Sequence, residues 1–221
     1  MATNVVITGA NRGIGLALTA KFAEQGANVY ALCRQSSTEL AKLGVNIITG
    51  INVATDEGIA AIKQHLQQVK IDILVCNAGI LRDENLSKFN IDTIRDQFEV
   101  NALAPLRVVH ALESNLNNAS KVAMITSRMG SIADNGSGGR FGYRMSKAAL
   151  NAASMSLSID LAPRQIAVGI YHPGYVQTDM VNHGGDISTT ICAERLVGLI
   201  NQLSMDNTGT FYHSNGQQLP W

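Results

Sequence analysis

Three residues in the second half of the chain have side chains that could exchange protons with a substrate: Ser127, Tyr143 and Lys147. Tyr143 and Lys147 are four residues apart in the segment YRMSK, and positions i and i+4 of a helix lie on one face. A nearby ammonium group favours the phenolate and lowers the pKa of a tyrosine from its usual value of about 10. The spacing therefore predicts a tyrosine that trades protons with an alcohol or a carbonyl near neutral pH.

Each of these residues also has a purely structural interpretation. A lone Tyr-x-x-x-Lys occurs by chance in many helices, and a lysine by itself is usually a solvated charge. Ser127 closes the apolar run VAMITS, where a serine often caps a helix or begins a turn. The glycine-rich segment TGANRGIG at residues 8–15 favours the chemical interpretation, because it offers a place for a dinucleotide.

Three glycines, Gly9, Gly13 and Gly15, follow the first apolar run and precede the first helical pattern. The pattern T-G-x-x-x-G-x-G differs in spacing from G-x-G-x-x-G, but the same physics applies. Gly9 permits a sharp turn, Gly13 lets the backbone approach a pyrophosphate, and Gly15 allows close contact between helix and strand. The N–H groups at the start of the helix would then meet the anion.

The end of the second apolar run, VYALCRQ, predicts which dinucleotide is bound. An acidic residue at this place accepts hydrogen bonds from the ribose of NAD, whereas an arginine accommodates the 2′-phosphate of NADP. Arg34 stands there, no acidic residue follows until Glu39, and Arg12 is a second cation within the glycine-rich turn. Unless both arginines are simply solvated, this charge pattern predicts NADP(H) in preference to NAD(H).

Short apolar runs alternate with longer helical patterns along the whole chain. Strands are expected at 4–8, 28–33, 45–50, 71–76, 121–126 and 166–171, with a seventh at 209–213. Helices are expected near 13–25, 36–42, 55–68, 90–117, 143–162 and 192–204, and Pro105 should kink or break the fourth. This alternation predicts an α/β fold: a doubly wound parallel sheet of six to seven strands with helices on both faces. Ligands of such sheets bind beyond the carboxyl ends of the strands.

The length of 221 residues suits a single domain spanning 1–221. The formal net charge is zero, which argues against a nucleic-acid partner or an anionic membrane surface. An odd count of three cysteines without metal-ligand spacing argues against a disulfide framework and against a metal site. With no signal-like or spanning apolar stretch, we expect a cytoplasmic protein, and the low content of charged residues suggests an oligomer.

Taken together, these motifs resemble those of the short-chain dehydrogenase/reductase family, over essentially the whole chain. The shared segments, in the family's order, are TGANRGIG, CNAG, Asn101, Ser127, YRMSK and PGYVQT. The segments YRMSKAALN and HPGYVQTDM and the ending GQQLPW are similar to the carbonyl-reductase-like branch that contains sniffer and C-factor. The resemblance implies a Rossmann-type fold, a small-molecule carbonyl or alcohol substrate, and a homodimer or homotetramer.

The resemblance also implies roles for four catalytic residues. Tyr143 would be the acid/base, and Ser127 would hydrogen-bond the substrate oxygen. Lys147 would hold the nicotinamide ribose and lower the tyrosine pKa. Asn101 would sit at the kink of its helix and hold a water that relays protons to Lys147. Without the resemblance, Asn101 would be interpreted as a helix-surface amide.

Cofactor contacts are implied at the ends of several strands. In the first turn they are Gly9, Asn11, Arg12, Gly13, Ile14 and Gly15, followed by Arg34 after the second strand. Further along they are Asn52, Val53, Asn77, Ala78, Gly79, Tyr143, Lys147, Pro173, Gly174, Val176 and Thr178. Asn52 stands where the family usually has an aspartate, although an amide carbonyl can also accept a hydrogen bond from adenine. His172 is expected to be a packed strand-end residue rather than a base.

The resulting hypothesis is an NADP(H)-dependent oxidoreductase that reduces a ketone or aldehyde, or oxidises the alcohol, with Tyr143 as acid/base. The alternative is a dinucleotide-binding regulatory or signalling protein with little turnover. An epimerase or dehydratase would share the Tyr/Lys pair but usually needs a longer carboxy-terminal substrate region than follows Thr178 here. The residues Arg128, Met129, Arg144 and Trp221 are candidates for the border of the substrate pocket.

Overall fold

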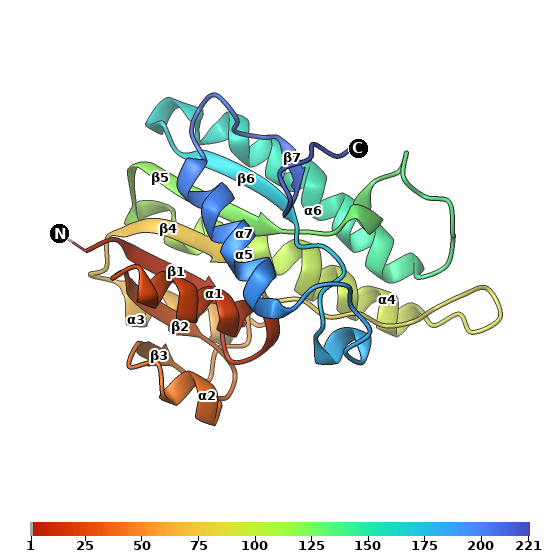
Figure 1. The fold of residues 1–221 in the computed structure, drawn as a ribbon, viewed down its shortest axis with the longest axis horizontal. Helices are drawn as coiled ribbons and strands as arrows, with labels where there is room; N and C mark the ends of the chain where they lie inside the picture. The colour runs from red at the N-terminus through yellow and green to blue at the C-terminus, as the bar shows by residue number, and fades with distance from the viewer. Residues whose placement is uncertain (1) are drawn as a thin grey trace.

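A seven-stranded parallel sheet lies at the centre of the computed structural model, which describes residues 2–221 (Figure 1). The strands are β1 (Asn4–Thr8), β2 (Asn28–Leu32), β3 (Asn46–Ile48), β4 (Ile71–Cys76), β5 (Leu116–Ile125), β6 (Ala167–His172) and β7 (Phe211–His213). Their order across the sheet is β3-β2-β1-β4-β5-β6-β7. The predicted doubly wound α/β fold is therefore confirmed. The strand order reverses direction between β1 and β4, which is where such sheets bind ligands.

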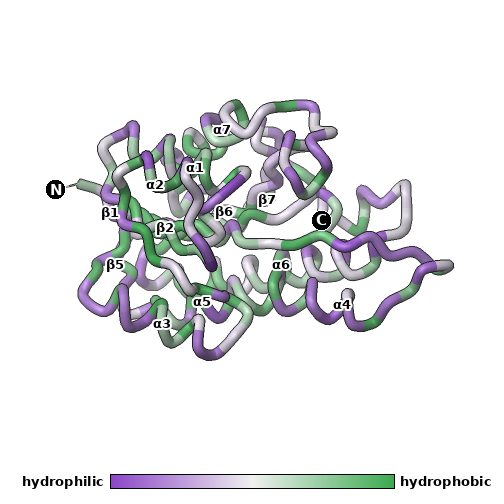
Figure 2. Tube along the Cα trace, turned by 90° about the horizontal axis from the view of Figure 1, so that it is seen from below, coloured by the Kyte–Doolittle hydropathy of each residue, from purple (hydrophilic) through white to green (hydrophobic). Residues whose placement is uncertain are grey.

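Helices cover both faces of the sheet because both faces of its strands are apolar. On one face lie α1 (Gly13–Glu24) and α7 (Thr189–Gln202), and on the other lie α3 (Asp56–Leu66), α5 (Ala104–Leu112) and α6 (Phe141–Asp160). The short α2 (Thr38–Ala41) follows β2, and α4 (Ile91–Phe98) packs on α6. Alternate residues of β1 serve the two cores: Val5 and Ile7 face α1 and α7, whereas Val6 faces α3 and α5. Figure 2 shows the apolar segments gathered in the middle of the molecule.

The helix expected over 90–117 is divided into three parts. After α4 comes a π-helical segment, Glu99–Leu103, and then α5, which has Pro105 in its first turn. Proline has no N–H to donate to the carbonyl four residues earlier, which belongs to Asn101. The expected irregularity is thus present, and it takes the form of a widened turn centred on Asn101.

The starts of β5 and α7 differ from the predicted ones, because hydrogen bonds made by polar side chains fix where these elements begin. β5 begins at Leu116, five residues before the predicted start, and its polar opening pairs with β4 from Ile71 onward. The Ser120 hydroxyl donates to the Ile71 carbonyl oxygen at 2.7 Å and stabilises this extension. Similarly, α7 begins at Thr189 because the Ser188 hydroxyl accepts a hydrogen bond from the Ile191 N–H.

Within residues 2–221, none of the helices combines the length and apolar character needed to span a membrane. The same part of the chain contains no group of three or more His, Cys, Asp or Glu side chains arranged to hold a metal ion. Cys33, Cys76 and Cys192 are free and buried. Burial raises the pKa of all three thiols, to about 12 for Cys76 and Cys192.

A close contact fixes the segment after β5 against α6. The short 3-10 segment Arg128–Gly130 packs on this helix, and a Cβ atom added at Gly130 would lie 2.7 Å from the carbonyl carbon of Lys147. Such separations do not occur between real Cβ atoms and backbone, so the loop and the helix could not keep their present spacing.

We expect Gly130→Ala to lower the free energy of unfolding by about 1–3 kcal/mol, as overpacking typically does. Gly136→Ala is the matched control, because its added Cβ meets nothing within 4 Å, and it should change stability by less than about 0.5 kcal/mol. Chemical denaturation of the two variants and the wild type measures both values. Equal stability of the two variants would contradict the tight packing of this loop on α6.

Candidate functional site

The glycine-rich turn after β1 has the backbone that its sequence predicts. Gly9 and Gly13 both have positive φ angles, of 68° and 55°. A Cβ added at Gly9 would lie 2.9 Å from Ala78 Cα, and one added at Gly15 would collide with the Gly9 carbonyl oxygen. Only glycine therefore lets this turn come so close to both the next strand end and its own helix.

The first turn of α1 is suited to an anion. Its N-cap residue, Arg12, makes no capping hydrogen bond through its side chain, and no acidic residue lies in the first turn. The first N–H groups of a helix have no partner within the helix, and together with the helix dipole they attract negative charge. The turn thus fits a dinucleotide pyrophosphate, which would lie on Gly13, Ile14 and Gly15, with Asn11 beside them.

The two arginines predicted to select NADP differ in their surroundings. Arg34 is exposed beyond β2, and its guanidinium makes no hydrogen bond or ion pair with the described part of the chain, residues 2–221. Arg12 instead pairs with Asp179, with 3.3 Å between Nη1 and Oδ2. Arg34 is therefore the freer of the two cations to meet a phosphate.

Asn77 ties the end of β4 to the glycine-rich turn. Its Nδ2 donates to the carbonyl oxygens of Thr8 and Gly9 at 3.0 and 3.2 Å, and its N–H donates to the Thr8 hydroxyl at 3.0 Å. Ala78 makes the close approach to Gly9, and Gly79 lies on the other side, where an added Cβ would be 3.7 Å from Lys147 Nζ. The segment Asn77–Gly79 thus connects the glycine-rich turn with the lysine of α6.

Asn101 is completely buried, which excludes the helix-surface interpretation of this residue. It lies in the π-helical segment, where its Oδ1 accepts a hydrogen bond from the Ile80 N–H at 2.8 Å. Its Nδ2 donates to the Ile80 carbonyl oxygen at 2.8 Å and to the Ser146 hydroxyl at 3.1 Å. The widened turn therefore locks the segment after β4 onto α6 beside Lys147.

Ser127, Tyr143 and Lys147 meet at the carboxyl end of β5. The Ser127 hydroxyl lies close enough to the Tyr143 phenol to lower its pKa. Lys147 Nζ lies 5.8 Å from the centre of the tyrosine ring and donates to the Ile125 carbonyl oxygen at 2.9 Å. All three side chains are buried, so the solvated-lysine interpretation does not hold. The Ser127 hydroxyl also accepts from the Met129 N–H at 3.2 Å, so it begins a turn as well.

The expected lowering of the tyrosine pKa is wrong in its net direction. Burial raises the pKa of Tyr143, and this effect exceeds the opposing effects of the Ser127 hydroxyl and of the Arg140 charge. Burial also lowers the pKa of Lys147, to about 8. The reason is that the lysine ammonium binds a backbone carbonyl instead of the phenol, while both groups have lost most of their solvent.

The end of β3 leads to the residues predicted to meet adenine. Asn52 is exposed, and its Oδ1 already accepts a hydrogen bond from the Ala54 N–H at 3.2 Å. Val53 is buried in the core beneath α3. An adenine amino group would therefore share the Asn52 side-chain oxygen with the backbone, through the second lone pair.

The loop after β6 lies opposite the glycine-rich turn. A Cβ added at Gly13 would lie 3.5 Å from Thr178 Cγ2, so this loop and the turn face each other across a narrow gap. The Pro173 carbonyl accepts from the Ser214 hydroxyl at 2.8 Å, and Gly174 has a φ of 97°. Val176 is buried and pairs with Ile187. These contacts fix the backbone of the segment predicted to hold the nicotinamide.

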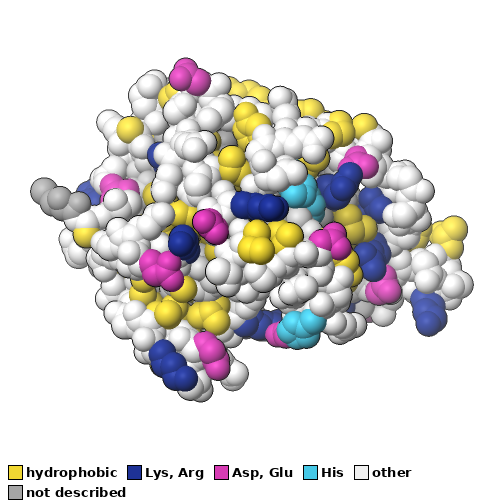
Figure 3. Space-filling model, viewed as in Figure 1, with side chains coloured by type: hydrophobic (Ala, Val, Ile, Leu, Met, Phe, Trp, Pro, Cys, Tyr) yellow, Lys and Arg dark blue, Asp and Glu magenta, His cyan; other side chains and the backbone are white. Residues whose placement is uncertain are grey.

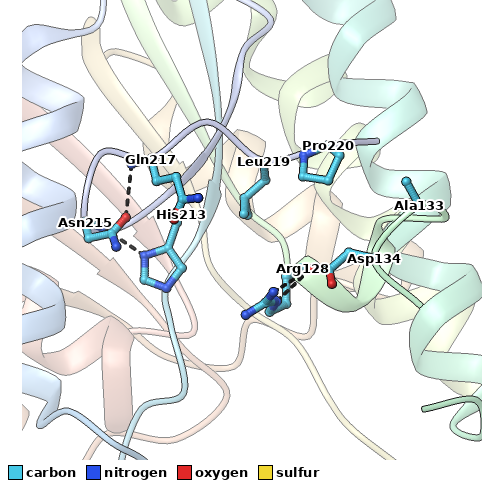
Figure 4. A pocket seen from close by; sticks show the side chains of 8 residues that line it. All are labelled: Arg128, Ala133, Asp134, His213, Asn215, Gln217, Leu219 and Pro220. Carbon is cyan, nitrogen blue, oxygen red and sulfur yellow. Dashed lines mark hydrogen bonds and ion pairs between the residues drawn. The ribbon is translucent and has the colours of Figure 1, made fainter. Parts of the chain in front are cut away.

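A hollow of about 470 Å³ lies beside these residues, between the loop after Ser127 and the carboxy-terminal segment (Figure 4). Arg128 extends into it and pairs with Asp134, with 2.6 Å between Nη2 and Oδ2. Ser127 and Tyr143 do not line it. Trp221, which was expected to border the substrate pocket, stacks on Phe211 with ring centroids 5.4 Å apart.

His172 is a packed residue, as expected. It is buried at the end of β6, its ring meets that of His213 edge-on at 4.9 Å, and its Nδ1 has no hydrogen-bond partner among residues 2–221. Burial and neighbouring positive charges lower the pKa of His172 to about 3, so the ring is neutral. A neutral, enclosed imidazole of such low basicity is a poor general base.

Two features near the start of α6 were not found from the sequence. The buried Glu84 carboxylate accepts hydrogen bonds from Thr93 Oγ1 at 2.7 Å and from Gln97 Nε2 at 2.5 Å. Arg140 lies immediately before α6, and its charge acts on the Tyr143 phenol. No local pattern indicates that Glu84 is buried, but the position of Arg140, three residues before Tyr143 and after two glycines, was a usable signal.

Comparison with known proteins agrees with this geometry. The sequence pattern of the short chain dehydrogenase family matches residues 3–186. The 1-hydroxy-2-glutathionyl-2-methyl-3-butene dehydrogenase of Rhodococcus sp. (strain AD45) is 34% identical over 225 residues, which cover 99% of this chain and 100% of that protein. The C-signal protein of Myxococcus xanthus is 38% identical over 159 residues, covering 68% of this chain and 93% of that protein.

Solved structures give the same result. The carbonyl reductase Sniffer of D. melanogaster superposes with a TM-score of 0.89 at 27% identity, covering 100% of both chains. The NADPH-bound carbonyl reductase from chicken fatty liver has a TM-score of 0.88 at 25% identity and covers 100% of this chain and 99% of its own. From its fold, its strand-end motifs and these matches, the chain belongs to the short-chain dehydrogenase/reductase family, whose members are oxidoreductases that bind a nicotinamide dinucleotide and act on small molecules.

Proposed function

We propose that this protein is an NADP(H)-dependent carbonyl reductase that converts a ketone or aldehyde to the alcohol, with Tyr143 as the acid. The observation that carries the proposal is the shared burial of Ser127, Tyr143 and Lys147, with Lys147 Nζ 5.8 Å from the centre of the tyrosine ring and the Ser127 hydroxyl near enough to act on the phenol. The carbonyl reductases among its structural neighbours support the reaction class. We further propose that residues 1–221 act as one cofactor-binding unit.

The protonation states favour reduction. At neutral pH the Tyr143 phenol keeps its proton, because burial raises its pKa, and a reduction needs a proton on that oxygen. When bound, a reduced nicotinamide supplies a hydride to the carbonyl carbon. Tyr143 donates its phenolic proton to the substrate oxygen, and Ser127 orients that oxygen through a hydrogen bond. Lys147 then faces a phenolate, and its positive charge stabilises the anion until a proton returns.

Arg34 supports NADP(H) as the cofactor. A guanidinium beyond β2 that has no partner within residues 2–221 suits a 2′-phosphate, whereas a ribose hydroxyl would require an acceptor there. The neighbouring structure of the chicken enzyme contains NADPH. Asn101, buried next to Lys147, is proposed to hold the water that returns the proton, and the remaining strand-end residues are proposed to hold the cofactor as the family pattern predicts.

The similarity to the C-signal protein supports a second candidate, a regulator that binds the dinucleotide and signals with little turnover. Such a protein would bind NADPH and fail to reduce carbonyl compounds. We favour the enzyme because the Ser127, Tyr143 and Lys147 side chains lie together. We also expect a homodimer or homotetramer, since α5 and α6 expose Leu106, Met155 and Ile159.

We expect Tyr143→Phe to lower kcat by at least about a hundredfold while NADPH still binds, because only the proton donor is removed. Steady-state reduction of a panel of aldehydes and ketones measures turnover, and NADPH fluorescence measures binding. The wild type serves as control, and its failure to reduce any compound would favour the regulator. Turnover retained in the variant would show that the acid is another residue.

We expect Arg34→Ala to raise the Kd for NADPH by about tenfold or more, because a charge-assisted contact to the 2′-phosphate is lost. The Kd for NADH should change by less than about twofold, since that cofactor has no phosphate at this position. Fluorescence titration of both cofactors with wild type and variant gives the four constants. An equal change for NADPH and NADH would contradict the proposed role of Arg34.

The low pKa of the Lys147 ammonium predicts a pH dependence of stability. In the unfolded chain the Lys147 side chain stays protonated up to about pH 10.4. In the folded protein its pKa is about 8, so the ammonium loses its proton near pH 8. The unfolded state therefore binds more protons between these values, and stability rises with pH. Relative to Lys147→Met, the wild type should gain about 2 kcal/mol of unfolding free energy from pH 8 to pH 10. Denaturation at several pH values tests this, and parallel profiles would contradict it.

A further inference from the structure

Arg140 occupies an unusual backbone position at the edge of the proposed active site. It directly precedes α6 and has left-handed backbone angles, with φ 50° and ψ 47°. Residues other than glycine rarely adopt this conformation, and here two left-handed glycines, Gly138 and Gly139, come just before it. Its N–H donates to the Glu84 carbonyl oxygen at 2.6 Å, and this hydrogen bond fixes the backbone and so the direction in which the Arg140 side chain points.

The Arg140 guanidinium lies between two segments that border the proposed reaction centre. Its Nε donates to Asp83 Oδ1 at 3.0 Å, in the segment that follows β4. Its Nη1 lies 3.9 Å from the Met129 sulfur, and Met129 is two residues beyond Ser127. The same charge opposes the rise that burial causes in the pKa of the Tyr143 phenol, so it acts on the proposed acid.

A second arginine, Arg144, also contacts Met129. Arg144, one helical turn further on, donates through Nη1 to the Met129 carbonyl oxygen at 3.4 Å and through Nη2 to the Ser137 hydroxyl at 2.8 Å. Within residues 2–221 its hydrogen-bond partners are all neutral. Figure 3 shows basic side chains on the right-hand side of that view, with acidic ones interspersed among them.

The acidic groups nearby do not cancel this charge. The Asp83 side chain is 79% exposed, and exposed ion pairs contribute little and exchange easily with other partners. Glu84 is buried, and its carboxylate is turned toward Thr93 and Gln97. Asp134 is already paired with Arg128 on the other side of the loop. Among residues 2–221, Asp83 is the one acidic side chain bonded to Arg140 or Arg144, so the two arginines together carry one positive charge more than this partner.

We propose that Arg140, assisted by Arg144, binds a carboxylate carried by the carbonyl substrate at the end remote from the reacting carbon. This inference rests on the proposed reductase function and specifies its substrate class: carbonyl compounds with an anionic group. A guanidinium binds a carboxylate through two parallel hydrogen bonds, and the substrate group would replace Asp83 on the outer side of Arg140. Arg140 is thus a residue that determines specificity.

The experiment compares two aldehydes that differ in charge and by one methyl group, 4-formylbenzoate and its methyl ester, with NADPH as reductant. For Arg140→Gln we expect the ratio of kcat/KM for the acid to that for the ester to fall by about tenfold, because a charge-assisted contact is lost. For Asp83→Asn the ratio should rise, because the competing carboxylate is gone. Arg95→Gln on α4 removes an exposed positive charge elsewhere and should leave the ratio unchanged within about twofold.

An unchanged ratio in Arg140→Gln, or an equal loss for both aldehydes, would overturn the inference. Circular dichroism checks that this variant is folded, and if it is not, the direction of change in Asp83→Asn decides. If the wild type reduces neither aldehyde, the proposed function fails for these compounds, and calorimetric binding of 4-(hydroxymethyl)benzoate to the NADP-loaded protein decides the inference separately. Binding about tenfold weaker in Arg140→Gln supports it, and equal binding overturns it.

Discussion

The burial of the Lys147 ammonium against the end of β5 is the interaction on which the rest of the site depends. Removing a charge from water is costly unless the charge is hydrogen-bonded, and here a single backbone carbonyl, that of Ile125, supplies the bond at 2.9 Å. The need for this hydrogen bond fixes the position of α6 along the direction of β5. It also leaves no room at Gly130, where the loop that carries Ser127 touches the helix backbone. The relative position of serine and tyrosine follows from these two contacts.

Polar contacts, more than apolar packing, join this centre to the glycine-rich turn. Thr8 accepts hydrogen bonds from the N–H groups of Asn77 and Ala78 at 3.0 and 3.1 Å. The next residues of the same segment reach Asn101, which is bonded to α6 through Ser146. Because each link is a directed hydrogen bond between buried or partly buried groups, a small displacement at one end leaves a donor or acceptor without a partner. The two halves of the site are therefore held at a defined separation.

Most of the fold could be predicted because strands buried on both faces are continuous apolar runs, and those runs are visible in the sequence. The glycines at the strand ends could be predicted too, because a Cβ atom at Gly9 or Gly15 would collide with neighbouring backbone and the positions therefore require glycine. The polar start of β5 was missed because its stabilisation comes from Ser120 reaching a neighbouring strand. The predicted direction of the Tyr143 pKa shift is wrong, because spacing on a helix indicates which groups are near each other but not how much solvent they lose.

Arg140 illustrates the same limit in another way. Its position just before the helix of Tyr143 can be seen in the sequence. Its partners, however, come from the segment after β4 and the loop after β5, and nothing local in the sequence indicates that these two segments meet. Residues whose environment is built from three distant segments can only be interpreted once the chain is folded.

The three enclosed thiols have a practical consequence. Their raised pKa values keep them almost entirely as neutral thiols, and only the thiolate attacks electrophiles. A reporter cysteine introduced in the exposed loop before α6, for example at Ser137, would therefore react with a maleimide dye while the native thiols of the folded protein stay unmodified. Fluorescence from that position would then follow the loop in the otherwise unaltered sequence.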